Sequence, residues 1–287
     1  MNTAKALTLT YLTPVSFASL NGSDKEADNI SSIKKISVGV DQYPYVSAQA
    51  VRRALRDQLA VLGWSLSEGA KSATDKGAAT TQCKPDGFID DDLFGFMNAQ
   101  KSGTNKRTSA VRVSPLIALN QYQGDLDFGT NYMGVEAGGD PNIFETEIHS
   151  GLYRGTILIE LDRVGSEDGK DFIKSDEKAK RVKSLLDAVK NLWTSGRQSR
   201  FLADISPKFV AAALLKVKNP IFLESVQVQE KALNTGMIEE TIKDYKGEII
   251  AHAFGVRQGF FSSVPDGALS IGDAFTKISS WVEEKYK

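Results

Sequence analysis

The strongest constraint on the fold is an amphipathic helix that the sequence places between two apolar strands. Residues 152–161 and 209–217 have the apolar character of buried strands. Residues 177–193 have helical periodicity, with an inward face of Val182, Leu185, Leu186, Val189 and Leu192. Weaker patterns predict strands at 6–12, 36–40 and 249–254, a turn at 21–24 and a closing helix at 271–281. Strands alternating with helices on one face of a sheet predict an α+β protein with an RNA-recognition (RRM) or ferredoxin-like fold.

A second predicted helix, after residue 46, carries two separate stripes. Ser47 is a plausible N-cap, and Pro44 before it favours an extended approach. One stripe is apolar and predicts packing on a sheet; its residues are Val51, Leu55, Leu59 and Leu62. The other stripe follows the i, i+3, i+4, i+7 spacing and consists of Gln49, Arg52, Arg53 and Arg56.

The basic stripe favours an anionic partner. Arg53 has a carboxylate at helical distance in Asp57, whereas Arg52 and Arg56 form a like-charge pair. Such a pair costs about 0.2–0.5 kcal/mol, which favours a counter-charge from outside the helix. A nucleic-acid phosphate backbone, close to the free N–H groups of the first helical turn, fits this requirement. A solvated basic face is the alternative.

The composition limits the kind of partner. The 287 residues, 41% of them hydrophobic, are enough for a large core, and we expect residues 1–287 to form a single elaborated domain. With 35 basic and 36 acidic residues, a globally basic nucleic-acid coat is excluded, so binding must come from a local groove. A single cysteine, no signal-peptide pattern and no membrane-spanning run predict a cytoplasmic protein.

Two regions predict projections from the core. Residues 65–87 and 98–108 have few apolar anchors, which indicates finger-type insertions within 65–109. Residues 127–150 contain two extended arms around a Gly-Gly-Asp-Pro tip, which predicts a long hairpin. Apolar residues near its tip have no evident core to enter and are candidates for contacts with bases or a neighbouring subunit: Tyr132, Met133, Ile143 and Phe144.

Little in the sequence predicts catalysis, a metal or another cofactor. Two histidines and one cysteine cannot form a zinc cluster, and no catalytic triad order is visible. Glu145, Glu147 and His149 alternate along a strand, and we assign this pattern to an exposed hairpin arm rather than to a metal site. We assign the aspartates at 90–92 to helix capping and the helix dipole rather than to magnesium.

Five segments, taken in order and spacing, carry a resemblance to a known family. They are residues 46–56 (VSAQAVRRALR), 93–97 (LFGFM), 112–119 (RVSPLIAL), 147–154 (EIHSGLYR) and 196–200 (GRQSR). Together they resemble the backbone subunit of type I CRISPR Cascade surveillance complexes, and the DevR branch of type I-B systems is the most similar. The similarity covers most of the chain, from the first strand to about Leu223.

The resemblance implies a hand-shaped protein with an RRM-like palm, the finger insertions at 65–109 and a thumb hairpin at 127–150. In this family, copies polymerise along one CRISPR RNA, and each thumb reaches over the next subunit and displaces one nucleotide. The guide segments left open pair with target DNA. The implied partners are further copies of the chain, a large subunit, a subunit that caps the guide 5′ end and a guide-processing endonuclease.

The resemblance also assigns roles to individual residues. Met97 would stack beside the displaced base, and Phe96 stands where relatives often carry an arginine. Arg197 and Arg200 would contact the RNA backbone, although charges that complement a helix C-terminus explain them equally well. The full RNA-binding set is Asn21, Ser47, Gln49, Arg52, Arg53, Arg56, Phe96, Met97, Arg197 and Arg200, and the thumb contacts are Asn131, Tyr132, Met133, Ile143 and Phe144.

Two other functions compete with that of an RNA-binding scaffold. Backbone subunits of type III complexes cut target RNA with a loop aspartate, and Asp41 lies in roughly that place, although turn aspartates are common. The DevR name invites a DNA-binding regulator, but no helix-turn-helix pattern is present in the sequence. The type I-like segments favour a non-catalytic scaffold.

Overall fold

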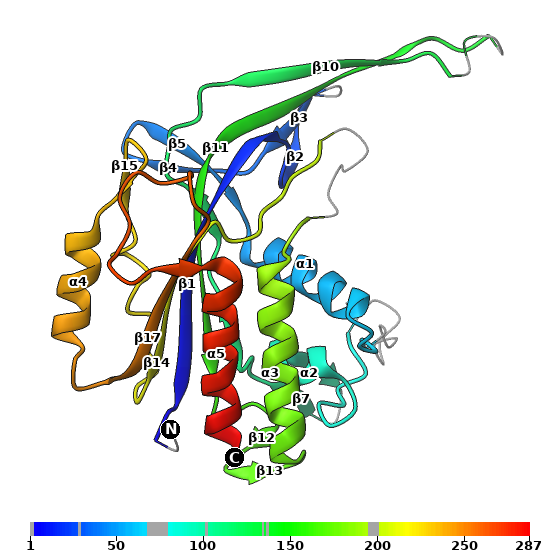
Figure 1. Cartoon of the computed structure of the whole chain (residues 1–287). Coiled ribbons are helices and arrows are strands. Elements are labelled where there is room, and N and C mark those ends of the chain that lie inside the picture. Colours follow the sequence, from blue (N-terminus) through cyan, green and yellow to red (C-terminus); the bar gives the residue numbers. More distant parts are fainter. Residues whose placement is uncertain are drawn as a thin grey trace.

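The computed structural model describes residues 3–27, 30–67, 80–100, 103–133, 135, 138–194 and 201–287. Its centre is an antiparallel sheet of four strands in the order β14, β1, β11, β9. The strands are β1 (Ala6–Ala18), β9 (Leu116–Ala118), β11 (Asn142–Glu160) and β14 (Phe209–Leu215). Helix α1 (Ala48–Val61) separates β1 from β9, and α3 (Ser175–Lys190) separates β11 from β14 (Figure 1). This βαββαβ order confirms the predicted α+β, RRM-like palm.

Further strands extend this sheet at both edges and along β11. On the β14 side lie β17 (Ile249–Val256) and β18 (Leu269–Ser270); on the β9 side lie β5 (Asp41–Val46) and β4 (Lys35–Val38). Strands β3 (Ile30–Ile33), β8 (Val111–Val113) and β10 (Asp125–Asn131) pair with β11, and β2 (Gly22–Ala27) pairs with β3. Three small hairpins are β6 (Phe96–Gln100) with β7 (Gly103–Arg107), β12 (Ser166–Glu167) with β13 (Lys170–Asp171), and β15 (Val228–Gln229) with β16 (Ala232–Leu233).

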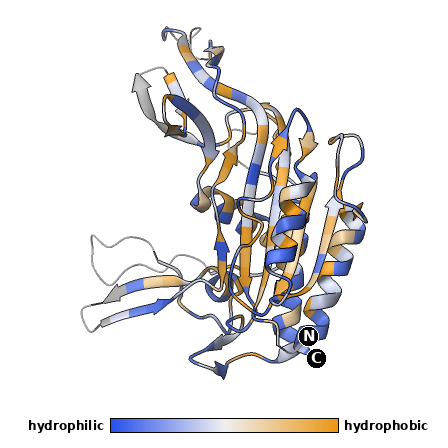
Figure 2. Ribbon diagram, turned by 90° about the vertical axis from the view of Figure 1, so that its left-hand side faces the viewer, coloured by the Kyte–Doolittle hydropathy of each residue, from blue (hydrophilic) through white to orange (hydrophobic). Residues whose placement is uncertain are grey.

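One face of the sheet is covered by α1, α3 and α5 (Ile271–Tyr286), with α2 (Ile89–Phe94) beside them. Figure 2 shows the apolar residues concentrated in the central strands and on the inner sides of the helices. The core on this face includes Leu9 and Ile157 from the strands and Leu55, Leu185 and Ile278 from the helices. None of the helices within the described ranges is both long and apolar enough to span a bilayer.

The opposite face is also covered, so the prediction that all helices lie on one face is wrong. Helix α4 (Thr235–Asp244) and the segments around it build a second core on this side. Consecutive residues of β14 alternate between the two cores, with Val210 in the first and Phe209 in the second. Because each face of β14 meets a core, every residue of that strand is buried.

The two predicted palm helices form with small shifts at their ends. The Ser47 hydroxyl accepts a hydrogen bond from the Ala50 N–H at 3.3 Å, which confirms Ser47 as the N-cap of α1. The apolar stripe of α1 ends at Leu59, because Leu62 lies past the helix end and is 45% exposed. Helix α3 ends at Lys190, although Leu192 still enters the core as predicted.

Of two local predictions before α1, the turn at 21–24 is wrong and the strand at 36–40 is confirmed with shifted ends as β4. Residues 21–24 do not form a turn, because β2 begins at Gly22 and pairs with β3, which in turn pairs with β11. The predicted strand at 36–40 ends at Val38, and Gly39 adopts a positive φ of 63° in the turn between β4 and β5. Long-range pairing has overridden local composition in the first case.

The range 65–109 combines core and projection. Within it, Ile89, Leu93 and Phe94 of α2 belong to the core under α1, while β6 and β7 form a separate hairpin. Residues 68–79 and 101–102 lie outside the described residues. The finger role of this range stays a prediction.

Gly95, which joins α2 to β6, is expected to tolerate no side chain. Its φ of 66° and ψ of 178° lie in a region that only glycine populates readily. A Cβ there would collide with the Arg107 carbonyl and lie 2.8 Å from the Ser109 nitrogen. We expect Gly95→Ala to lower the free energy of unfolding by about 3 kcal/mol or more.

The matched control is Gly39→Ala. Gly39 has a similar φ of 63°, but a Cβ added to it would meet nothing within 4 Å. We expect this change to cost only about 1 kcal/mol. Denaturant unfolding of both variants checks the pair, and equal losses would contradict the steric argument.

Candidate nucleic-acid interface

The start of α1 is fixed by Asn21. The Asn21 side-chain oxygen accepts a hydrogen bond from the Ser47 N–H at 2.9 Å, while its carbonyl accepts one from the Lys34 N–H. Gln49, in the first turn of α1, is exposed. The predicted RNA contacts Asn21, Ser47 and Gln49 therefore lie together. Asn21 fixes the first residue before α1 through its hydrogen bond to Ser47.

The three arginines of α1 have different partners. Arg53 is paired with Asp57 at 2.9 Å and its side chain is 76% exposed. Arg56 lies 3.4 Å from the buried Asp90 carboxylate of α2. Arg52 donates to the carbonyl oxygen of Phe94, which carries no charge. The expectation that Arg56 needs a counter-charge from outside the protein is therefore wrong, whereas the charge of Arg52 has no carboxylate partner among the described residues.

Phe94 orients Arg52 and Arg56 together. Its ring centroid lies 5.4 Å from the guanidinium carbon of Arg52 and 5.5 Å from that of Arg56, both within cation–π range. Burial lowers the pKa of Arg52 and the neighbouring charge of Arg56 lowers it further, although an arginine stays protonated. Phe94 was not among the predicted site residues, although it lies in the 93–97 segment that carries part of the family resemblance.

Phe96 and Met97 begin the β6–β7 hairpin directly after Gly95. Met97 is 71% exposed, whereas Phe96 is half-buried. Met97 pairs with Lys106 across the hairpin, so an apolar side chain and a cation lie on neighbouring strands. Stacking of Met97 against a base stays a prediction.

The aspartate run of α2 is a buried structural network, so its assignment to helix capping is wrong. Asp90, Asp91 and Asp92 are 2%, 0% and 0% exposed, and the α2 N-cap residue, Phe88, makes no side-chain cap. Asp90 accepts from the Ser67 N–H at 2.9 Å and Asp91 from the Lys84 N–H at 2.8 Å. Backbone N–H groups from outside α2 thus bind both carboxylates, although the second oxygen of Asp91 is buried without a hydrogen-bond partner among the described residues.

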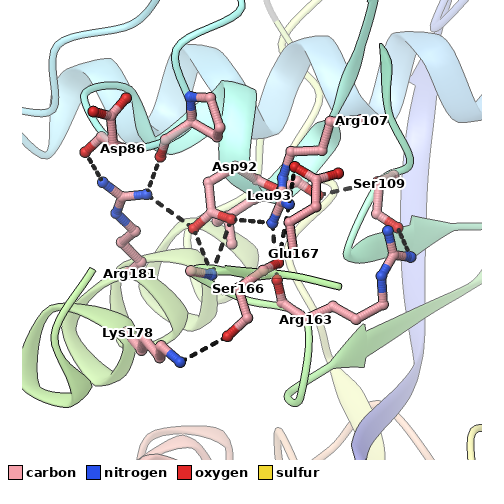
Figure 3. Close-up of polar contacts among 12 residues, drawn as sticks. Asp86, Asp92, Leu93, Arg107, Ser109, Arg163, Ser166, Glu167, Lys178 and Arg181 are labelled. Carbon is pink, nitrogen blue, oxygen red and sulfur yellow. Dashed lines mark hydrogen bonds and ion pairs between the residues drawn. The ribbon is translucent and has the colours of Figure 1, made fainter. Parts of the chain in front are cut away.

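Asp92 joins four segments of the chain (Figure 3). Its carboxylate accepts from Arg107 at 2.5 Å, from Arg181 at 2.9 Å and from the Gly165 N–H at 3.0 Å. Arg107 ends the β6–β7 hairpin and Arg181 belongs to α3. The network therefore fixes α2, and with it Phe94, against the β6–β7 hairpin and the helical layer.

The hairpin of β10 and β11 is continuous with the central sheet. Strand β11 runs from Asn142 in the hairpin to Glu160 at the far end of the palm, and β10 pairs with its first seven residues (Figure 1). Tyr132, Met133 and Ile143 are 64%, 91% and 46% exposed. The Asn131 side chain accepts from the Met133 N–H at 2.9 Å and thereby orders the turn at the tip.

Phe144 is the exception among the predicted tip residues. It lies opposite Gly129 across the hairpin, and a Cβ on Gly129 would collide with the Phe144 ring at 2.5 Å. The ring therefore packs over the glycine, so Phe144 has a partner within the hairpin. Its role in subunit contact stays a prediction, as do those of the other four residues.

Glu147 and His149 do not lie on an exposed arm, which corrects their assignment. They are 7% and 5% exposed at the base of the hairpin. Glu147 pairs with Lys35 at 2.8 Å and accepts from the Ile33 N–H at 2.8 Å. Burial opposes ionisation of Glu147, but these contacts and a hydrogen bond from Tyr122 bring its pKa below the ordinary value. The charged pair anchors the hairpin to β4.

The sheet face opposite α1 and α3 is closed to RNA bases at β1 and β14. RRM proteins stack bases on aromatic residues of that exposed face. Here Leu12 and Phe209 on this face are fully buried, under a cover that includes Phe222 and Ile238. Bases cannot stack there, whereas Gln49 at the start of α1 is exposed.

The structure describes one of three further predicted residues, Asp41, whereas Arg197 and Arg200 lie outside the described residues. Asp41 is the first residue of β5, directly after the turn that joins it to β4. This place fits an ordinary turn aspartate.

Chains of this architecture occur in CRISPR surveillance complexes. One, described as a CRISPR RNA-guided surveillance complex, pre-nicking, has a TM-score of 0.63 and 13% identity, covering 98% of this chain and 100% of the other. A second, described as a CRISPR RNA-guided surveillance complex, has a TM-score of 0.60 and 14% identity, covering 96% and 99%. The fold is that of a chain of such complexes.

The sequence defines the family. Residues 12–235 match the family model described as CRISPR-associated negative auto-regulator DevR/Csa2, and the chain belongs to this family. A curated relative, the CRISPR-associated protein Cas7/Cst2/DevR of Myxococcus xanthus (strain DK1622), is 26% identical over 241 residues, which cover 77% of this chain and 76% of the relative. The family resemblance carried by the five segments is confirmed.

The Asp92 network yields a prediction about stability. Asp92→Asn removes the charge that matches Arg107 and Arg181 and leaves two buried guanidinium groups without it. We expect a loss of about 3–5 kcal/mol in the free energy of unfolding. Denaturant unfolding with and without added Mg²⁺ measures the loss. Added Mg²⁺ is expected to leave the free energy of unfolding unchanged in both the variant and the wild type.

Asp86→Ala is the matched control. Asp86 contacts Arg181 only through its backbone carbonyl, at 2.8 Å, and its side chain is exposed. Its replacement is expected to change stability by less than about 0.5 kcal/mol. A large stabilisation of the wild type by Mg²⁺ would instead identify the aspartate run as a metal site.

Proposed function

We propose that this chain is the RNA-binding backbone subunit of a type I CRISPR RNA-guided surveillance complex in the cytoplasm. Copies assemble along one guide RNA, together with a large subunit, a subunit that caps the guide 5′ end and the guide-processing endonuclease. Pairing between guide and target DNA supplies sequence recognition, so the protein needs to hold the backbone of any guide. The role consists of binding and requires no bond cleavage by this chain.

One observation carries the proposal: the cationic face at the start of α1 keeps a charge available. Arg52 is held by a carbonyl oxygen, and a neutral acceptor leaves the guanidinium charge uncompensated. Exposed Gln49 and Arg53 lie on the same side of the helix. Phosphate contacts from such side chains give affinity for any sequence.

The contacts of Phe94 and Asp90 with the arginines of this face support the proposal. A guanidinium has five N–H donors, and the described contacts of Arg52 use one of them. Because Phe94 restricts the rotamers of Arg52 and Arg56, less side-chain entropy is lost when a phosphate binds. We assign Arg52 to phosphate binding and Arg56, which is neutralised by Asp90, mainly to its positioning.

The remaining predicted RNA contacts rest mainly on the family resemblance. The exposure of Met97 supports its stacking beside a displaced base. Asn21 and Ser47 support the start of α1. Arg197 and Arg200 are proposed on the resemblance alone.

We further propose that the β10–β11 hairpin is the thumb that contacts the next copy. A protrusion on one copy that fits a different surface on the next produces a head-to-tail contact, and such contacts generate open helical filaments. The hairpin exposes Tyr132 and Met133 at its tip and Leu126 and Phe128 along β10. Exposed apolar residues gathered on one projection are typical of an interaction surface.

Replacement of Arg52 tests RNA binding. Arg52→Ala is expected to raise the dissociation constant for guide RNA at least about tenfold, or about 1.4 kcal/mol, for every guide sequence. The slope of log affinity against log salt is expected to fall by about 0.7, whereas Arg52→Lys retains most of the slope. Filter binding at several salt concentrations measures both quantities.

Lys243→Ala is the control, because Lys243 is an exposed cation on α4, which covers the other face of the sheet. It is expected to leave affinity and slope unchanged. Unchanged affinity in Arg52→Ala, with the fold intact by circular dichroism, would count against the α1 interface. Failure of the wild-type protein to bind any guide RNA would count against the function itself.

Replacement of the hairpin tip tests assembly. The double change Tyr132→Ser and Met133→Ser is expected to reduce the number of copies per guide RNA, because it removes apolar contact area on the neighbour. The free energy of unfolding is expected to stay within about 0.5 kcal/mol of the wild type, since both side chains are exposed. Native mass spectrometry of RNA-bound complexes measures the copy number, and Val264→Ser, an exposed apolar residue elsewhere, serves as the control.

A further inference from the structure

A second surface of suitable chemistry lies at one end of the helical layer. A hollow of about 570 Å³ opens where the C-terminal end of α3 meets the N-terminal end of α5, which lie side by side (Figure 1). Its lining includes Lys190, Trp193, Leu202, Asp204, Arg257 and Ile271. None of these residues belongs to the interface at α1.

Contacts of Asp204 with Trp193 and with Thr13 hold one side of this hollow in place. Trp193 and Asp204 form an isolated antiparallel bridge. The Asp204 carbonyl accepts a hydrogen bond from the Thr13 hydroxyl of β1 at 3.3 Å, and its carboxylate accepts from the Ser206 N–H at 2.9 Å. The rim of the hollow is thereby tied to the central sheet.

The hollow carries an excess of positive charge. The Asp204 carboxylate is matched by Lys208 at 2.7 Å, and Lys208 itself is 4% exposed. Lys190 and Arg257 make no side-chain hydrogen bond or ion pair with the rest of the described chain. Two cations therefore face the hollow, while its one lining carboxylate is already paired.

An accessible aromatic ring accompanies these cations. Trp193 is 47% exposed, in contrast to Trp281, which is 4% exposed in the core. Leu202, 80% exposed, adds apolar surface on the same rim. An exposed ring next to unpaired cations is the combination with which proteins bind single-stranded nucleic acids, because a base stacks on the ring and a phosphate meets the cation.

The position of the hollow favours RNA over another protein. Thr13, which holds its rim, belongs to β1, and the end of that strand leads to Asn21 at the start of α1. The hollow and the α1 interface thus flank the same end of β1.

We propose that the hollow binds one further nucleotide of the guide RNA, with its base against Trp193 and its phosphate in reach of Lys190 and Arg257. This inference rests on the proposed function, since it extends the same RNA path. It adds three residues to those that the family resemblance assigns.

Tryptophan fluorescence of the full chain tests the inference, with a single-stranded uridine oligonucleotide as the probe. RNA is expected to quench the fluorescence of the wild type through contact with the exposed Trp193. In Trp193→Phe the quench is lost while affinity stays within about twofold, because phenylalanine still stacks. In Trp193→Ala affinity falls about tenfold. The control Trp281→Phe keeps the quench, because that indole is buried.

A second pair of variants keeps the test independent of the ring. Lys190→Ala with Arg257→Ala is expected to lower the slope of log affinity against log salt by about 1.4, from two lost phosphate contacts. Unchanged slope and affinity in this pair, or an unchanged quench in Trp193→Phe, would overturn the inference. If RNA binding then still depends on Arg52, the proposed function stands although the inference about the hollow is wrong. Reduced copy number with unchanged RNA affinity would identify the hollow as a subunit contact instead.

Discussion

The buried carboxylate of Asp92 is the interaction on which the arrangement of the interface depends. Asp92 is fully buried and accepts from Arg107 and Arg181, so two guanidinium groups are desolvated together with one carboxylate. Such a cluster is stable only when its geometry is complete, because each unpaired buried charge costs several kcal/mol. The Gly165 N–H and the carbonyls that accept from Arg181 complete it. These contacts fix the position of α2, and Phe94 and Asp90 on α2 in turn hold Arg52 and Arg56 of α1.

One surface of the palm is covered, and another is exposed. Because α4 and its neighbouring segments cover the sheet at β1 and β14, bases cannot stack there as they do on an open RRM sheet. The protein is left with the edge where β1 ends, α1 begins and β11 leaves the palm as a hairpin. Strand β11 contributes both to the core and to the hairpin, so the projection has the rigidity of the central sheet at its base. The Lys35–Glu147 pair adds a charged anchor at the point where β11 leaves the palm.

Elements with local signals could be predicted from the sequence, and contacts between distant segments could not. Ser47 identifies the start of α1, and the spacing of Val182, Leu185 and Leu186 identifies the buried face of α3, because both signals lie within one or two helical turns. By contrast, the aspartates of α2 have the appearance of a cap until Arg107 and Arg181 are placed beside them. Glu147 and His149 alternate as on an exposed arm, and only their contacts with distant residues, Lys35 for Glu147 and Asn120 for His149, reveal that they are buried. Helix α4 is capped by Asn234 and buries Ile238, but the second core that it covers is built from segments far apart in the sequence, which local spacing does not reveal.

In the candidate site, the sequence alone also fails to predict which arginine keeps an uncompensated charge. From spacing alone, Arg52 and Arg56 are equivalent, since each lies one helical turn from the other and neither has a carboxylate three or four residues away on the helix. The fold makes them different, because Asp90 neutralises Arg56 while a carbonyl oxygen of the same short helix meets Arg52. A carbonyl oxygen orients a guanidinium group but leaves its charge uncompensated. A buried carboxylate orients the guanidinium and also neutralises its charge. A protein that must bind any guide needs cations that are held in place and still attract phosphate, and Arg52 meets both conditions on one aromatic support.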